Sequence, residues 1–259
     1  IGSPEERIQE DYLRILRYVR FHTQYSKTNH EQNIIHPIKK YINGLNIISN
    51  ERIFSEFQKI LKLKNIYSLF LDDFIKEIIL NIFPTFKYYQ RLKTIKELDQ
   101  KLRNKYDFQM ILALLIVDHS NNYEYFCHKY KTSNKLKNRL KNLSINFENL
   151  KSKKFFSEEN MKKLIYLNGK DSVEDLLLFS LCVNSKIKSS YFEKILAYVS
   201  KCDIPKFPIS GDYLKSKGYK TGENLGKKLK LLEAEWIKNN FVIEKKIIEK
   251  SLGQTNNEN

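Results

Sequence analysis

The sequence contains few residues that interrupt helices, with only 8 glycines and 5 prolines among 259 residues. Because these two residues end or kink helices, such a chain is typical of helices joined by short turns. A long apolar run is also missing, since the longest, from Met110 to Val117, is far too short to cross a bilayer. We recognise no secretory signal, and the simplest expectation is a soluble cytoplasmic protein.

Cysteine and histidine are too scattered to predict a disulfide framework or a zinc site. The three cysteines show no C-x-x-C spacing. Of the five histidines, His119 and His128 lie nine residues apart with Cys127 adjacent to the second. His22, His30 and His36 lie in or beside a polar stretch, Thr23 to Pro37, that we expect to be a loop. We therefore expect no metal site in this chain.

The charge is strongly unbalanced, with a formal net charge of +16. A basic surface of this size favours a polyanionic partner such as RNA. Lysine, asparagine, isoleucine, tyrosine and phenylalanine are also abundant, and all five have AT-rich codons. Part of the basicity can therefore reflect an AT-rich genome, and charge alone leaves nucleic-acid binding open.

Residues from Pro4 to Phe21 show a helical period, with Ser3 as a cap and Pro4 in the first turn. The predicted apolar face contains Ile8, Tyr12, Ile15, Leu16 and Val19. The opposite face gathers Arg7, Glu10, Asp11, Arg14 and Arg17. The pattern predicts one amphipathic helix with carboxylates and guanidinium groups on its wet face. Taken alone, such a cluster is most simply a set of solvated surface ion pairs.

The run R-I-x-E-D-Y-L-R-I-L-R-x-x-R-F within this stretch resembles the nucleotide-selecting E-D-x-x-R motif of class II tRNA nucleotidyltransferases, the CCA-adding enzymes and bacterial poly(A) polymerases. Cytosine and adenine present an exocyclic amine beside an unprotonated ring nitrogen, whereas uracil and guanine reverse both groups. A carboxylate accepts from that amine and a guanidinium donates to that nitrogen. The resemblance implies that Asp11 and Arg14 select the nucleotide and that Glu10 and Arg17 orient them, with Arg7 in support.

A second helix is predicted from Ser49 or Asn50 to about Leu63. Its start, I-S-N-E-R-I-F-S-E-F, resembles the S-x-E-R-I-x-x-E-L motif of the same family, with Phe57 in place of leucine. Arg52 and Glu56 are four residues apart, so we expect an ion pair that supports the first helix. An ordinary surface pair is an equal alternative.

Helical patterns continue through the middle of the chain, where no group of residues predicts a catalytic or binding site. We expect helices over 66–83, 86–102, 107–118, 123–131, 133–143, 157–169, 176–182 and 190–199, the sixth ended by Gly169.

The composition changes after Cys202, where two prolines and half of all glycines gather. A last helix is expected from about Gly222 to Phe241. The segment resembles the closing P-x-x-G-x-D-L-x-x-x-G-x-x-x-G-x-x-x-G-x-x-L signature of bacterial CCA-adding enzymes, except that Tyr213 stands at the aspartate position and Asp212 precedes it. The resemblance implies RNA contacts, and the alternative is a helix packed through Trp236. The implied RNA-binding residues are Gly222, Gly226, Lys227, Lys228 and Lys230.

Together these patterns predict an all-α, elongated helical array. We expect a neck with the nucleotide-selecting helix over 1–64, a helical body over 65–202, a glycine-rich tail over 203–250 and a disordered end over 251–259. The resemblance implies the nucleotide-selecting and tRNA-binding C-terminal portion of a CCA-adding enzyme or poly(A) polymerase. The resemblance implies that the chain's partner is a tRNA or another RNA 3′ end, and that the chain does not bind a membrane.

The family's head motifs, G-G-x-x-R-D and D-x-D, do not occur in these residues, and residue 1 is Ile. We therefore expect a fragment or one half of a split enzyme, with a separate head polypeptide as a candidate partner. Mg²⁺, CTP and ATP are implied for the family, with the metal site outside this chain, which alone should not catalyse nucleotide addition. The alternatives are a non-enzymatic basic helical protein that binds RNA or protein, and a decayed gene remnant.

Overall fold

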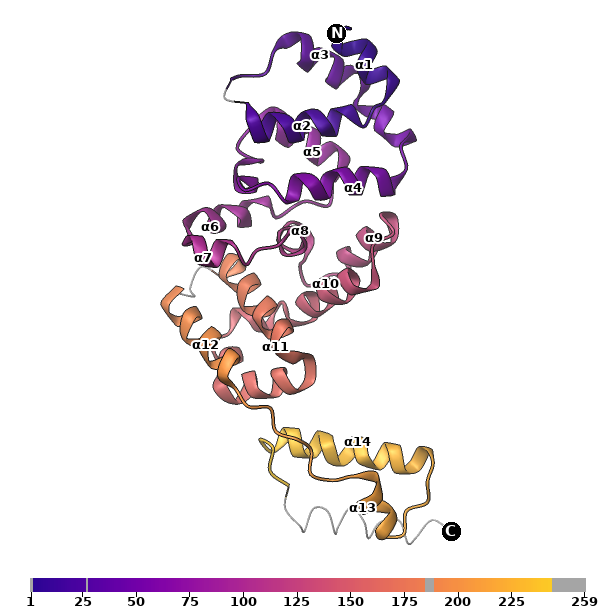
Figure 1. Ribbon diagram of the computed structural model, residues 1–259, viewed down its shortest axis with the longest axis vertical. Coiled ribbons are helices and arrows are strands. Elements are labelled where there is room, and N and C mark those ends of the chain that lie inside the picture. Colours follow the sequence, from indigo (N-terminus) through magenta and orange to yellow (C-terminus); the bar gives the residue numbers. More distant parts are fainter. Residues whose placement is uncertain (1, 27, 185–188, 244–259) are drawn as a thin grey trace. The chain divides into compact units, whose positions relative to one another are not determined.

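The structure is a computed structural model that describes residues 2–26, 28–184 and 189–243 (Figure 1). Every regular element in these ranges is helical, which confirms the predicted all-α fold. Within the same ranges, none of the helices combines the length and apolar character that crossing a membrane requires. The predicted disordered end, 251–259, lies outside the described residues.

The chain divides into two compact units. Unit 1 comprises residues 1–153 and 174–194, and unit 2 comprises residues 154–173 and 195–259. The α-helices are α1 Pro4–Glu10, α2 Arg14–Tyr25, α3 Gln32–Tyr41, α4 Asn50–Leu61, α5 Asp73–Ile82, α6 Leu92–Glu97, α7 Gln100–Arg103, α8 Phe108–Ile116, α9 Asn122–Lys129, α10 Asn134–Asn146, α11 Glu158–Val183, α12 Ser189–Lys201, α13 Gly211–Ser216 and α14 Glu223–Lys238. The 3-10 helices are η1 Ile42–Ile47, η2 Ile66–Ser68, η3 Tyr89–Arg91, η4 Asn149–Lys151 and η5 Lys153–Phe156.

The core of unit 1 is rich in phenylalanine. Phe57 of α4 is fully buried, and its ring centroid lies 4.4 Å from that of Phe83 and 5.2 Å from that of Phe86. Helix α8 is buried from Met110 onward and packs against α4, whose other neighbour is α2. Helix α4 therefore connects α2, which packs against it, to the aromatic core of unit 1.

Side-chain caps divide two of the helices that periodicity predicts as continuous. The Asp72 carboxylate accepts from the Ile75 N–H, so α5 begins at Asp73 rather than at Ile66. Asp99 accepts from Leu102 N–H and separates α7 from α6 within the predicted helix over 86–102. A capping aspartate offers the backbone a hydrogen bond that competes with helix continuation. The two continuous-helix predictions are therefore wrong.

The predicted loop over Thr23 to Pro37 is wrong at both ends, because α2 continues to Tyr25. Helix α3 begins at Gln32 and contains Pro37 in its interior. Proline removes one helical hydrogen bond, but Pro37 and Ile38 are both buried, and α3 packs against α1. Tertiary burial therefore outweighs the local cost of the proline.

Unit 2 is organised around the single tryptophan. The Trp236 ring on α14 lies 5.3 Å from both Tyr166 and Phe207, measured between ring centroids. A small cluster of Ile209, Leu214 and Leu232 continues this core. Helix α13 is capped by a serine hydroxyl and adds a short helix that the glycine and proline content does not predict.

Candidate functional site

The predicted first helix is broken at Asp11, so the prediction of one continuous helix face is wrong. Helix α1 ends there in an extended conformation, with φ −155° and ψ 101°, and α2 starts at Arg14. The Asp11 carboxylate accepts from the Leu13 N–H at 3.2 Å, and its carbonyl accepts from the Arg14 N–H at 3.0 Å. These bonds hold Asp11 and Arg14 within one turn of chain.

The break is stabilised by a close approach between Tyr12 and Gly44. A Cβ atom placed on Gly44 would overlap the Tyr12 ring, so the ring occupies the space that any other residue's side chain needs. Gly44 lies in η1, directly after α3. The position of Asp11 therefore depends on a glycine far along the chain.

We expect Gly44→Ala to destabilise the protein by about 1–3 kcal/mol, because the new methyl group must push the Tyr12 ring aside. Urea unfolding measures the change. Gly226→Ala is the matched control, since no atom lies within 4 Å of the Cβ it would add. As a helix-interior substitution it should instead stabilise by roughly 0.5–1 kcal/mol. Equal effects of the two substitutions would contradict the packing role of Gly44.

Two guanidinium groups flank the Asp11 carboxylate. Arg52 Nη2 from α4 lies 3.4 Å from Oδ1, and Arg17 Nη2 from α2 lies 3.8 Å from Oδ2. The Asp11 side chain is 22% exposed, less than either arginine. The carboxylate is thus held between two elements with one edge open to solvent.

Arg14 is held by a different carboxylate. Its Nη2 lies 3.0 Å from Glu10 Oε2, which also receives Arg7 Nη1 at 2.9 Å. Arg14 is 37% exposed. The acceptor, Asp11, and the donor, Arg14, therefore have separate supporting partners, and neither neutralises the other through an ion pair.

The predicted Arg52–Glu56 ion pair is wrong. Arg52 lies in the first turn of α4 and reaches Asp11, whereas Glu56 is 2% exposed and faces α2, where it accepts from Arg20 Nε at 2.7 Å and from Lys59 Nζ at 2.8 Å. Burial raises the pKa of the Glu56 carboxyl, but the hydrogen bonds from Lys59 and Arg20 outweigh it and hold that pKa below its usual value. Sequence reasoning missed Arg20, which lies 36 residues from its partner.

The predicted RNA-binding residues lie in unit 2, on and before α14. Gly222 is the N-cap residue with φ 149°, Gly226 faces open space, and Lys227 pairs with Glu223 at 2.7 Å. Lys228 is half-buried and Lys230 is exposed. At the position where the resembling signature has aspartate, Tyr213 is 39% exposed, and the neighbouring Asp212 pairs only with Lys215 among the interactions described.

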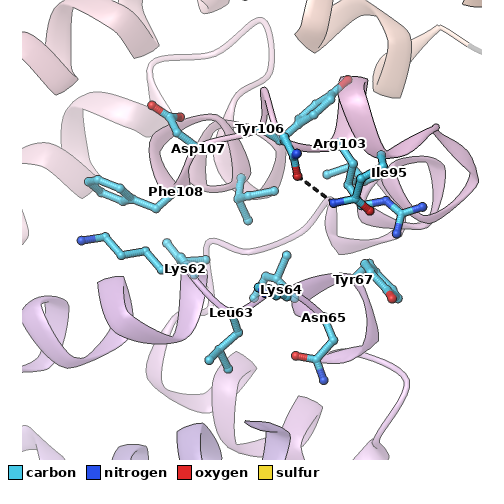
Figure 2. A pocket seen from close by; sticks show the side chains of 15 residues that line it. Lys62, Leu63, Lys64, Asn65, Tyr67, Ile95, Arg103, Tyr106, Asp107 and Phe108 are labelled. Atoms are coloured by element: carbon cyan, nitrogen blue, oxygen red, sulfur yellow. Dashed lines mark hydrogen bonds between the residues drawn. The ribbon is translucent and has the colours of Figure 1, made fainter.

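A pocket of about 530 Å³ opens in unit 1 between the end of α4 with η2 and the α6–α8 region (Figure 2). Lys62, Lys64 and Arg103 bring positive charge to it, and Tyr67 and Phe108 contribute aromatic rings. The acid in its lining, Asp107, is bound by the Arg139 guanidinium at 2.6 Å and N-caps α8. The pocket is not evident from the sequence, because its lining comes from two separate stretches of chain, 61–67 and 95–111.

The chain is similar in sequence to known CCA-adding enzymes and in part to an RNA-binding family. The family described as "Probable RNA and SrmB- binding site of polymerase A" matches residues 30–88. The chain is 26% identical over 257 residues to the mitochondrial CCA tRNA nucleotidyltransferase 1 of Danio rerio, covering 98% of this chain and 58% of that protein. Over nearly its whole length this chain is therefore similar to CCA-adding enzymes, and one segment of it matches an RNA-binding family of polymerase A.

Solved structures show the same fold. The Bacillus stearothermophilus CCA-adding enzyme in complex with CTP superposes with a TM-score of 0.65 at 17% identity, over 98% of this chain and 64% of that one. The Thermotoga maritima CCA-adding enzyme complexed with tRNA superposes with a TM-score of 0.57 at 18% identity, over 96% and 62% of the respective chains. The chain thus spans about three fifths of the length of these CCA-adding proteins.

Proposed function

We propose that this chain selects CTP and ATP and holds the RNA 3′ end during addition of C and A to tRNA. The observation that carries the proposal is that Asp11 and Arg14, on either side of the α1–α2 break, are each held by side chains of opposite charge. Arg52 and Arg17 hold Asp11, and Glu10 holds Arg14, so an acceptor and a donor stand one turn apart at a solvent-facing edge.

The proposed selection follows from hydrogen-bond complementarity. Asp11 accepts from the exocyclic amine of cytosine or adenine, and Arg14 donates to the adjacent unprotonated ring nitrogen. Uracil and guanine place a carbonyl against the carboxylate and an N–H against the guanidinium, which leaves both protein groups unpaired. The arginines behind Asp11 and the glutamate behind Arg14 limit the side-chain motion that could relieve this mismatch.

The charged cluster at the break does not fit a divalent metal. Asp11 and Glu10 are each engaged by two guanidinium groups, which occupy the oxygens that Mg²⁺ would need. The proposed role of Asp11 and Glu10 is in recognition of the base.

The nucleotide-selection test supplies the chain with a catalytic head polypeptide, fused or in trans, and measures incorporation of all four nucleotides. We expect C and A to be added in preference to U and G. Asp11→Ala and Arg14→Ala should each lose about 1–3 kcal/mol of discrimination, a factor of about 5 to 150. Lys151→Ala, which removes an exposed surface pair with Glu148, is the control and should change nothing. Full preference for C and A in both site variants would refute base reading by this cluster.

We propose two RNA contacts. One is formed by the lysines of α14, and the other by the pocket cations Lys62 and Lys64, which lie in the segment that matches the RNA-binding family. Changing Lys227, Lys228 and Lys230 together to alanine should weaken tRNA binding and flatten its dependence on salt. Each lost phosphate contact reduces the slope of log K against log salt concentration by about 0.7–0.9. The double variant Lys62→Ala with Lys64→Ala should act likewise, and Lys151→Ala again serves as control. An unchanged slope in either variant excludes that surface from the RNA footprint.

A further inference from the structure

Two histidines and an aspartate from three separate segments meet in unit 1. His22 lies in the last turn of α2, His30 precedes α3, and Asp72 is the N-cap residue of α5. One potential ligand atom from each residue lies within 4.8 Å of the other two. The scattered cysteines and histidines predicted no metal site, and Asp72, 42 residues from His30, was not among the candidate ligands.

Both imidazole rings are positioned by groups outside the cluster. The Tyr18 hydroxyl lies 2.6 Å from His30 Nδ1, and a hydrogen bond to the backbone of Thr28 acts on the His22 ring. In metal-binding histidines one ring nitrogen is usually held by a supporting group and the other binds the ion. In His30 that other nitrogen, Nε2, bonds to Asp72 Oδ2 at 2.8 Å. Here His22 Nε2 is buried and has no hydrogen-bond partner. An orphaned buried nitrogen of this kind is unusual and points to a missing ligand.

The donor types also suit metal binding. Each imidazole offers a nitrogen lone pair, through which histidine binds a metal. Asp72 Oδ2, 2.8 Å from His30 Nε2, supplies the negative charge.

We propose that His22, His30 and Asp72 form a binding site for a zinc-class divalent cation. Two imidazoles and one carboxylate are a donor set that zinc uses, whereas Mg²⁺ and Ca²⁺ prefer oxygen ligands. Zinc–nitrogen bonds of about 2.0–2.1 Å place tetrahedral ligand atoms about 3.4 Å apart. Binding therefore requires His30 Nε2 and Asp72 Oδ2, now 2.8 Å apart, to separate slightly, and any pair near the 4.8 Å limit to approach.

Coordination also requires one ring to turn out of the present stack. The two imidazole centroids lie 3.9 Å apart with an interplanar angle of 24°, and a metal must lie in the plane of each ring it binds. The bound ion would link α2 to the start of α5. Because α2 carries Arg14 and Arg17, the site would tie the candidate nucleotide-selecting segment to the rest of unit 1.

Isothermal titration of the chelator-treated full chain with ZnCl₂, without RNA, tests the proposal. We expect one zinc ion per chain and a rise in Tm on binding, since a ligand that binds only the folded state stabilises it. His22→Phe retains an aromatic ring for stacking and Asp72→Asn retains a helix cap, yet each removes a ligand. Each should weaken zinc binding at least tenfold, whereas the exposed His128→Asn should not.

Failure of the wild-type chain to bind zinc at a 1:1 ratio would overturn the proposal. So would zinc binding of unchanged affinity in both His22→Phe and Asp72→Asn, because the ion would then sit elsewhere. Circular dichroism verifies the fold of each variant, and the Asp72→Asn result decides alone if His22→Phe does not fold. The measurement uses no nucleotide or RNA, so its outcome is independent of the proposed function.

Discussion

Replacing Phe57 with alanine should destabilise the protein by about 3–5 kcal/mol, the usual cost of removing a fully buried aromatic ring. The ring contacts Phe83 and Phe86 and lies on α4, which packs against both α2 and α8. Its removal leaves a cavity at the centre of unit 1. Urea denaturation followed by far-ultraviolet circular dichroism measures the loss.

Phe57→Leu is the matched control, because the resembling family motif has leucine at this position. It keeps much of the apolar volume and should cost about 1–2 kcal/mol. If alanine and leucine were equally tolerated, the aromatic cluster would contribute little to the core. The comparison therefore separates ring packing from simple burial of apolar surface.

Arg20→Met should cost about 2–4 kcal/mol at neutral pH, because it leaves the Glu56 carboxylate buried with only Lys59 as a charged partner. Methionine preserves the apolar stem of the side chain, so the loss reports chiefly on the ion pair. Urea unfolding at pH 7 measures it. Lys151→Ala, at a solvent-exposed pair, should lie within about 0.5 kcal/mol of the wild type.

The cost of Arg20→Met should shrink in acid. The folded-state pKa of Glu56 is below its usual value of 4.5, so the stability that the ionised carboxylate contributes is present above that pH and disappears as pH falls through the folded pKa. Protonation removes the buried charge that Arg20 compensates. Unfolding measured on both sides of pH 4.5 tests this, and a cost independent of pH would show that Arg20 acts through packing alone.

Local signals predicted three capped helices, α4, α8 and α10, but not the capped helices α5, α7 and α13. Ser49 accepts from the Arg52 N–H, Asp107 from the Met110 N–H and Ser133 from the Leu136 N–H, and the three helices that follow lie close to where periodicity placed them. A cap and an apolar stripe act within a few residues, so a sequence contains both signals in full.

The candidate site could be predicted only in its residue types. Asp11, Arg14, Arg17 and Glu10 do gather, but the break that positions them requires Gly44 to admit the Tyr12 ring. Arg52 reaches Asp11 across 41 residues of sequence instead of pairing along its own helix. Contacts between residues so far apart in the sequence depend on tertiary packing, and local periodicity does not predict them.

The division of the chain into units determines which fragments of it can be expressed as folded pieces. Unit 1 is discontinuous in sequence, because residues 154–173 belong to unit 2 and the chain then returns to unit 1. The returning segment includes Leu176 and Phe179, both fully buried, and the carbonyl of Leu178 accepts a hydrogen bond from Tyr106. A fragment that stops at residue 153 would therefore expose an unfilled core, and a separable unit 1 must retain both segments with a short linker in place of residues 154–173.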